Sequence, residues 1–285
     1  MDKKESLEEK LTKWVKDQGY PLEMITANAF RASGFSVDLS HTYDDPETSE
    51  RREIDVTAAR RVYPKGPYLF EISFKVECKA SRDKPWVVFT DKPYPLSSFP
   101  DSAICSNVWS TVTYSFRGQN DVNNHLQKLP LFDNVYTGYS LTQAFTSGQD
   151  VCYKALMSCV KASEASVQEY DRSILSKHLY LVGVAIPVIV IDCPLFLSWI
   201  SEDGELKISE IERAVVNWSR TTAEKSCDVH IVSKDSLQNF VKYALQSCCV
   251  YEDSALKCSS DLSEAVKHEQ FMFKHKRLLK ADSSK

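Results

Sequence analysis

Residues 68–81 read Tyr68-Leu-Phe-Glu-Ile-Ser-Phe-Lys-Val-Glu-Cys-Lys-Ala-Ser81. From Ile72 to Lys79, apolar and polar residues alternate, which is typical of a β-strand with one buried and one exposed face. This period of two places Glu77 and Lys79 on the same face, about 7 Å apart along the strand. A carboxylate that can hold a divalent cation, beside an amine that can steer or deprotonate a water, suits hydrolytic chemistry. We expect the sheet and the site to be organised around this strand.

The composition is that of a soluble globular protein. The 285 residues are 43% hydrophobic and 26% charged and include only 8 Gly and 11 Pro, which argues against long flexible linkers. The formal net charge of −4 gives no overall attraction to a polyanion, so nucleic-acid binding would need local basic patches. The N-terminus is charged, and the longest apolar run, residues 179–192, is too short to span a membrane and contains Pro187. We expect a soluble, cytoplasmic protein that does not contact a membrane.

Several kinds of site are not indicated by the sequence. The nine cysteines contain no CxxC pair, so we expect free thiols in a reducing compartment rather than a zinc ribbon or a disulfide framework. The motifs GxSxG, GxxxxGK[ST] and GxGxxG are absent, which excludes the signatures of serine-hydrolase elbows, P-loops and Rossmann dinucleotide sites.

The remaining segments predict one α/β domain. Apolar residues at helical spacing predict helices over 6–18, 21–34, 149–168 and 236–246 and from about 260 onward. Alternating or wholly apolar runs predict strands over 35–40, 51–62, 68–81, 86–89, 179–192 and 229–232, with a hairpin over 196–208. We expect a single domain over 1–250 with its core at about 20–192, followed by a charged helix and tail over 251–285. Residues 93–146 show no clear pattern and are expected to be an insertion with short elements of its own.

Acidic residues lie at defined places in this order of elements. Glu23 falls in the first turn of the second helix. Strand 51–62 is expected to place Glu53, Asp55 and Thr57 on one face and Ile54, Val56 and Ala58 on the other.

The order of Glu23 on a helix, Asp55 on a strand and Glu77-x-Lys79 on the next strand resembles the PD-(D/E)XK nuclease superfamily. The resemblance in motif covers about residues 20–90, and the resemblance in element order extends to about 192. It implies a restriction-endonuclease-like fold, a mixed central sheet flanked by helices, with an insertion and C-terminal accessory elements. It also implies that Asp55 and Glu77 hold a metal, with Lys79 as the signature lysine and Glu23 as a supporting acid. The sequence departs from the family in having Ile54 where a proline commonly precedes the aspartate.

Further residues are expected to serve the same site. The backbone carbonyl of Cys78 is a candidate additional metal ligand, because the side chain of that position is apolar. Gln149-Asp-Val-Cys-Tyr153 resembles the Gln-x-x-x-Tyr motif of the superfamily's exonuclease branch. Gln149, Tyr153, Arg52 and Arg82 are therefore expected to contact nucleic acid. A wider set of basic residues is expected to cluster around the site, namely Arg51, Arg52, Arg60, Arg61, Lys75 and Arg82.

The sequence therefore predicts a deoxyribonuclease that uses Mg²⁺, or Mn²⁺, with RNA as the alternative substrate. Any sequence specificity would come from residues 93–146, from the C-terminal elements, or from a second copy of the chain or a partner protein. One alternative is a catalytically inactive nuclease-fold module that binds nucleic acid or protein, and another is a protein whose acidic surface binds a partner. At the level of the residues, the alternative is that Glu77 and Lys79 lie on a solvated strand face with a cross-strand ion pair from Lys79 to Asp55. The bare pattern is weak, because Glu8-Glu9-Lys10 repeats it within a helix.

Overall fold

The computed structural model describes residues 5–80, 84–95, 103–116, 129–146, 150–175, 179–219 and 226–282. Its α-helices are α1 (Leu7–Asp17), α2 (Tyr20–Ala32), α3 (Asn107–Phe116), α5 (Val151–Ser173), α6 (Leu237–Lys257) and α7 (Ser259–Asp282). Its strands are β1 (Ser36–Asp44), β2 (Arg51–Val62), β3 (Tyr68–Ala80), β4 (Trp86–Phe89), β5 (Ile104–Cys105), β6 (Tyr136–Gly138), β7 (Ser140–Gln143), β8 (Tyr180–Asp192), β9 (Leu195–Ile200), β10 (Leu206–Ile211), β11 (Arg213–Ser219) and β12 (Ser226–Ser233).

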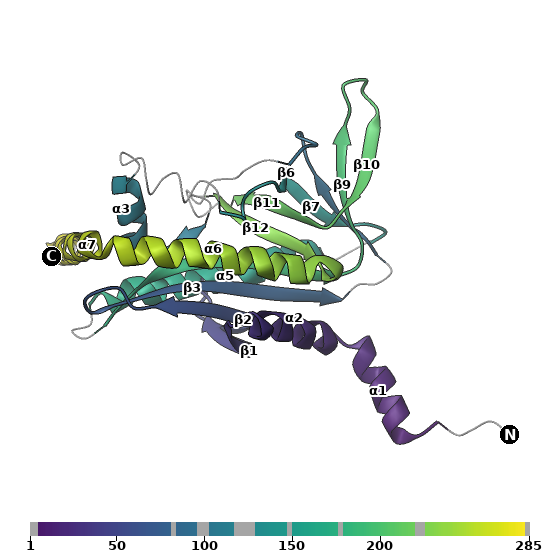
Figure 1. Ribbon diagram of the computed structural model, residues 1–285, viewed down its shortest axis with the longest axis horizontal. Helices are drawn as coiled ribbons and strands as arrows, with labels where there is room; N and C mark the ends of the chain where they lie inside the picture. The colour runs from purple at the N-terminus through teal and green to yellow at the C-terminus, as the bar shows by residue number, and fades with distance from the viewer. Residues whose placement is uncertain are drawn as a thin grey trace.

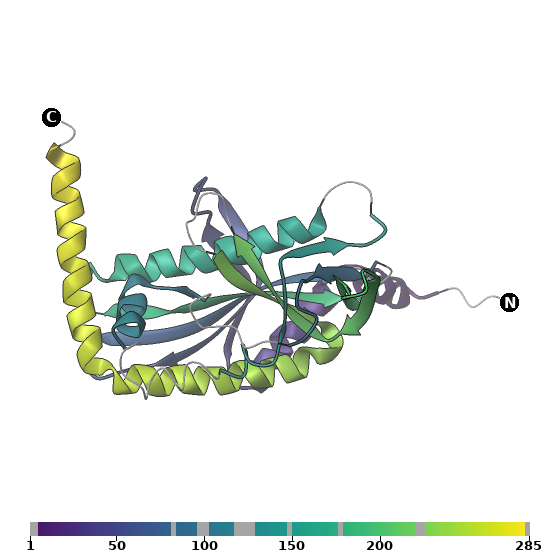
Figure 2. The ribbon, with the colours of Figure 1, turned by 90° about the horizontal axis from the view of Figure 1, so that it is seen from above.

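The larger sheet is mixed and has the strand order β1-β2-β3-β8-β12-β11-β6, with β5 paired to β8. The strands β1, β2 and β3 form an antiparallel meander, whereas β3, β8 and β12 are parallel neighbours. Helices cover both faces: α5 lies along one, and α2 and α6 lie along the other (Figures 1 and 2). The expected α/β class, a mixed sheet flanked by helices, is confirmed.

The core consists of two apolar layers separated by this sheet. One face carries three packed phenylalanines: Phe30 of α2, Phe74 of β3 and Phe240 of α6. The centroid of the Phe74 ring lies 5.5 Å from that of Phe30 and 6.4 Å from that of Phe240. The α5 face holds the second layer, which includes Leu156 and Ile189. Burial of each such side chain contributes about 1.5–3 kcal/mol. Strand β8 is apolar throughout because both of its faces are covered, as its sequence predicted.

The polar face of β3 is buried, contrary to the expectation of a half-exposed strand. Ser73, Lys75 and Glu77 are all buried because α5 lies across them. The Tyr170 hydroxyl of α5 lies 3.3 Å from the Ser73 hydroxyl and also donates to the Glu71 carboxylate. Alternation along one strand shows which residues share a face, but a helix 80 residues further along the chain decides whether water reaches that face.

A second sheet, of order β10-β9-β4-β7, lies at one end of the larger one (Figure 1). The described part of the expected insertion supplies β5 and β6 to the larger sheet and β7 to the smaller one, so it is integrated into the fold. Gly138, at the end of β6, has no room for a side chain: an added Cβ would lie 2.2 Å from a Val88 methyl group of β4. Glycine therefore allows the two sheets to meet here. Strand β11 was not predicted from the sequence.

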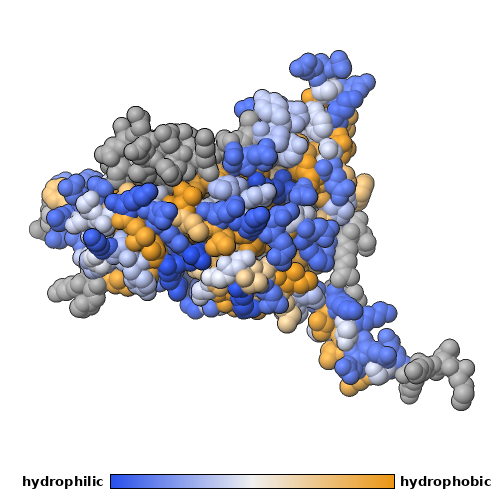
Figure 3. All heavy atoms as spheres, in the orientation of Figure 1, coloured by the Kyte–Doolittle hydropathy of each residue, from blue (hydrophilic) through white to orange (hydrophobic). Residues whose placement is uncertain are grey.

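The outlying elements carry exposed apolar residues. Figure 3 shows such side chains on α1 and on the β9–β10 hairpin, where Leu7, Trp14, Ile200 and Ile208 are exposed. Residue 250, where we expected the domain to end, lies inside α6. In the part of the chain that the structure describes, no helix combines the length and the apolar character needed to cross a membrane.

Candidate acid–lysine site

The site forms where β2 separates from β3. Their ladder ends at the pair Val56 and Val76, so Asp55 and Glu77 follow as the first residues beyond it. The regular alternation of β2 also breaks here: Val56 packs on the α2 side of the sheet, whereas Ile54 packs in the layer beneath α5. The expectation that Ile54 and Val56 share a face is therefore wrong. The Asp55 carboxyl is placed in the gap by this change of direction.

Asp55 replaces the missing strand partner of Cys78. Its Oδ2 accepts a hydrogen bond of 2.7 Å from the backbone N–H of Cys78. The N–H and C=O of one strand residue point toward the same neighbouring strand, so the Cys78 carbonyl also points to the gap. Burial, followed by the Glu77 carboxylate, raises the pKa of Asp55 to about 7, although the Cys78 N–H and the Lys79 ammonium act to lower it. Asp55 and Glu77 are thus close enough for the Glu77 carboxylate to oppose the ionisation of Asp55.

Glu77 is held at both of its oxygens. Lys79 Nζ donates to Oε1 at 2.5 Å, and the Ser158 hydroxyl of α5 donates to Oε2 at 2.6 Å. Only 8% of Glu77 is exposed. Burial acts to lower the pKa of Lys79, but the charge and hydrogen bond of Glu77, together with the Asp55 carboxylate and Cys78, outweigh it and the net pKa is raised, so Lys79 is an ammonium at neutral pH. The ion pair joins Lys79 to Glu77 on the same strand rather than to Asp55.

Helix α2 brings Glu23 to the same cluster. The Cys78 thiol lies 3.7 Å from the Thr26 hydroxyl and packs α2 against β3, and Glu23 lies one helical turn before Thr26. Burial raises the pKa of Glu23, and the nearby carboxylates of Glu53 and Glu77 raise it further. Four of the predicted site residues, Glu23, Asp55, Glu77 and Lys79, are therefore brought together, with Glu53 at the edge.

The donor atoms suit a hard divalent cation. Among the described residues, no group of three or more His, Cys, Asp or Glu side chains is arranged to hold a metal ion. The available donors are two carboxylates and a backbone carbonyl, and Mg²⁺ is commonly bound by one or two carboxylates with waters in its other positions. Asp55, whose ionisation is opposed by burial and by Glu77, would be stabilised in its charged form by a nearby cation. The residues present therefore fit the expected metal.

Ser158 is the site residue that sequence reasoning missed. It lies 81 residues after Glu77 and belongs to no motif. Its backbone carbonyl accepts from the Tyr43 hydroxyl at 3.3 Å, so β1 also helps to fix this turn of α5. The only available signal was its position on the helix that had to cover β3, and that depends on tertiary packing.

Two of the four residues expected to contact nucleic acid, Arg52 and Tyr153, lie within the described part of the chain. Gln149 and Arg82 lie outside the described residues. Arg52 forms ion pairs with Asp45 at 2.7 Å and with Glu50 at 3.1 Å, at the β1–β2 turn. Tyr153 is half exposed, and its ring lies 5.6 Å from that of Trp218.

The wider basic cluster is a wrong expectation. Arg60 pairs with Glu252 and Arg61 pairs with Glu71, both at the end of β2 away from Asp55. The remaining described members are Arg51, which pairs with Asp44, and Lys75, which is buried. The arginines are therefore paired with acids of the fold itself, and Lys75 is covered by α5.

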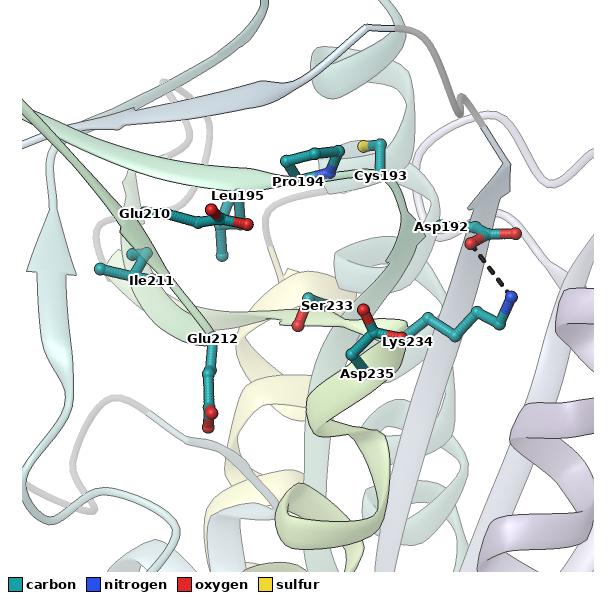
Figure 4. A pocket seen from close by; sticks show the side chains of 10 residues that line it. All are labelled: Asp192, Cys193, Pro194, Leu195, Glu210, Ile211, Glu212, Ser233, Lys234 and Asp235. Carbon is teal, nitrogen blue, oxygen red and sulfur yellow. Dashed lines mark hydrogen bonds and ion pairs between the residues drawn. The ribbon is translucent and has the colours of Figure 1, made fainter.

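A cavity of about 550 Å³ opens at the same edge of the larger sheet (Figure 4). It begins at Asp192, which pairs in register with Ala80 at the end of β3, and it is bordered by Lys234, whose Nζ lies 3.1 Å from Asp192 Oδ1. The carboxyl ends of β3, β8 and β12 therefore meet here. Open α/β sheets bind ligands at such ends.

In comparisons with protein-family models, with curated proteins and with solved structures, no match to this chain was found.

Proposed function

We propose that the protein is a Mg²⁺-dependent nuclease of restriction-endonuclease-like fold that hydrolyses phosphodiester bonds, most readily in DNA. The observation that carries this proposal is the convergence of Asp55, Glu77 and Lys79 at the point where β2 leaves β3. A carboxyl whose pKa is raised by a neighbouring carboxylate, as that of Asp55 is by Glu77, does not stabilise the fold by itself and is typical of sites that hold a cation.

The order of the elements supports the same proposal. The helix α2, the meander β1-β2-β3, the helix α5 and the strand β8, which is parallel to β3, follow one another as the resemblance to PD-(D/E)XK nucleases implies. Glu23 lies on the first of these helices. Asp55 and Glu77-x-Lys79 lie on the second and third strands of the meander.

Each residue has a definite task in this chemistry. A bound Mg²⁺ would offset charge on the scissile phosphate and lower the pKa of a water. Asp55 and the Cys78 carbonyl present oxygens to the gap, and Glu77 is oriented through Lys79 and Ser158. The Lys79 ammonium lies where it can orient the attacking water and offset the charge that develops on the phosphate oxygens.

One observation favours the alternative of an inactive module that binds nucleic acid. Both oxygens of Glu77 already have partners, so the Glu77–Lys79 pair is neutral without a ligand. If that pair does not rearrange, the fold would remain a scaffold and the acids would not act together.

Cleavage assays separate these functions. We expect wild type to cut DNA, offered in separate assays as single-stranded, linear and plasmid DNA, in Mg²⁺ or Mn²⁺, and Asp55→Asn and Lys79→Ala each to lower the rate at least about 100-fold, as loss of one preorganised electrostatic group does. Lys10→Ala is the matched control, because Glu8-x-Lys10 repeats the motif on the exposed helix α1. The proposal fails if wild type cuts neither DNA nor RNA. Retained binding without cleavage would then support the scaffold.

A further inference from the structure

Outside the acid site, a pair of aromatic rings stands out at the N-terminal end of α5. The rings of Tyr153 on α5 and Trp218 on β11 have centroids 5.6 Å apart and an interplanar angle of 67°. Tyr153 is 49% exposed, and Trp218 is partly exposed. An edge-on pair of this kind stabilises itself by about 0.5–1.5 kcal/mol, but it leaves one ring face open to solvent.

This pair lies at the same end of the sheet as the acids. Along α5, Tyr170 contacts Glu71 and Ser158 contacts Glu77, so the helix runs opposite to β3 and its N-terminus lies toward Lys79. Tyr153 precedes Ser158 by five residues, or about 7.5 Å along the helix axis. The rings are therefore within the reach of a chain a few units long that occupies the acid site.

A third ring lies just before the same helix. Phe145 is 84% exposed and has a backbone φ of 57°, a conformation that is costly for a bulky residue. The backbone N–H of Ala144 donates to the Pro85 carbonyl at 2.9 Å, which places the exposed Lys84 beside this turn. An exposed phenyl ring on strained backbone, close to a lysine in the fold, adds nothing to the packing of the core. A ligand with flat apolar faces and negative charge would be able to contact both the Phe145 ring and the Lys84 ammonium.

We propose that Tyr153 and Trp218 stack the bases of a single-stranded polynucleotide bound at the acid site, and that Phe145, which precedes the same helix in the chain, adds a further exposed ring. This inference rests on the proposed function and specifies its substrate class. Bases have aromatic faces that any exposed ring can stack against, and in a duplex those faces are already covered by neighbouring base pairs. The net charge of −4 and the internally paired arginines leave little attraction for a duplex backbone, so stacking provides the preference for an unpaired strand.

The test measures binding apart from cleavage. Fluorescence anisotropy on the full chain carrying Asp55→Asn would compare a labelled oligothymidylate, an abasic oligonucleotide of equal length and a duplex. We expect Trp218→Ala and Tyr153→Ala each to weaken oligothymidylate binding about 10-fold, with little change for the abasic strand. Trp218→Phe should restore most of the loss. Tyr63→Ala removes an exposed ring at the far end of β2 and should change nothing.

The outcomes are distinct from those of the nuclease test. Equal affinity of the wild-type and ring variants for oligothymidylate would overturn the stacking proposal, as would equal losses on the base-containing and abasic strands. Tyr153→Ala keeps the test usable if Trp218→Ala does not fold, because Tyr153 is at the surface. Stacking without cleavage by wild type would refute the nuclease and leave the binding site. Cleavage of DNA by wild type, with binding unchanged in the ring variants, would support the nuclease and refute the stacking site.

Discussion

The substitution Asp55→Asn should make folding less sensitive to pH. The pKa of Asp55 is raised from 3.8 to about 7, first by burial and then by Glu77. The native state therefore binds a proton that the unfolded chain releases at lower pH. Stability linked to Asp55 is fully present below the unfolded pKa and is lost as the pH rises toward 7. The amide that replaces the carboxyl carries no such proton, so the variant should lack this loss.

The size of the effect follows from the same pKa. Each pH unit between the unfolded and folded values corresponds to about 1.4 kcal/mol. Two of these units lie between pH 5 and pH 7, so the wild type should lose about 3 kcal/mol more than the variant over this range. Solvent that reaches the partly exposed carboxyl reduces this figure to about 2 kcal/mol.

Urea unfolding at pH 5 and pH 8 measures this difference. The double difference between two proteins and two pH values removes any cost of the substitution that does not depend on pH, such as a weaker hydrogen bond to Cys78. Asp203→Asn on the exposed β9–β10 turn is the matched control, and it should follow the wild type. Adding Mg²⁺ at pH 8 should stabilise the wild type by about 2.7 kcal/mol at 100 times the Kd, and the Asp55→Asn variant by much less.

Parallel curves for wild type and Asp55→Asn from pH 5 to pH 8 would show that Asp55 is ionised in the native protein. The electrostatic argument for paired acids would then be incorrect. An equal Mg²⁺ response in both proteins would remove Asp55 from the set of metal donors.

Substitutions at three other positions test the polar groups between α5 and the strands that it covers. Lys75→Met should raise stability by about 1–3 kcal/mol at pH 7, because burial lowers the pKa of Lys75 to about 8 and Lys75 has no hydrogen bond or ion pair among the described residues. Wild type should become more stable as the pH rises from 8 toward 10 and Lys75 loses its charge. Urea unfolding of the Met variant should not show this gain. Lys161→Met should lower the free energy of unfolding by about 3 kcal/mol in chemical denaturation, because the buried Asp45 loses the Lys161 ammonium that lies 2.7 Å away and keeps only its ion pair with Arg52. An unchanged stability would show that Arg52 alone is enough to stabilise the Asp45 carboxylate. Ser158→Ala should cost about 1–2 kcal/mol and Ser158→Thr less, and cleavage should fall with both unless Lys79 alone orients the acid.

Local patterns in the sequence were reliable wherever a segment's own neighbours decide its form. The alternation of residues 68–80 and the apolar run of 180–192 predicted β3 and β8. The chain order of Glu23, Asp55, Glu77 and Lys79 also predicted a cluster that the fold does assemble. The segments that form β6, β7 and β11 were missed, because they are short or irregular and depend on partners distant in the chain.

The candidate site shows the same division between local pattern and tertiary packing. The sequence alone determined which acids lie on which strands and in which order, because side-chain direction along a strand follows from backbone geometry. Only the tertiary structure decided that β3 is covered on both faces and that Ser158 reaches Glu77. It likewise paired the arginines with internal acids instead of leaving them beside the site. These outcomes depend on which distant segments share a buried interface. That interface decides which opposite charges a side chain can pair with, whatever their separation in sequence.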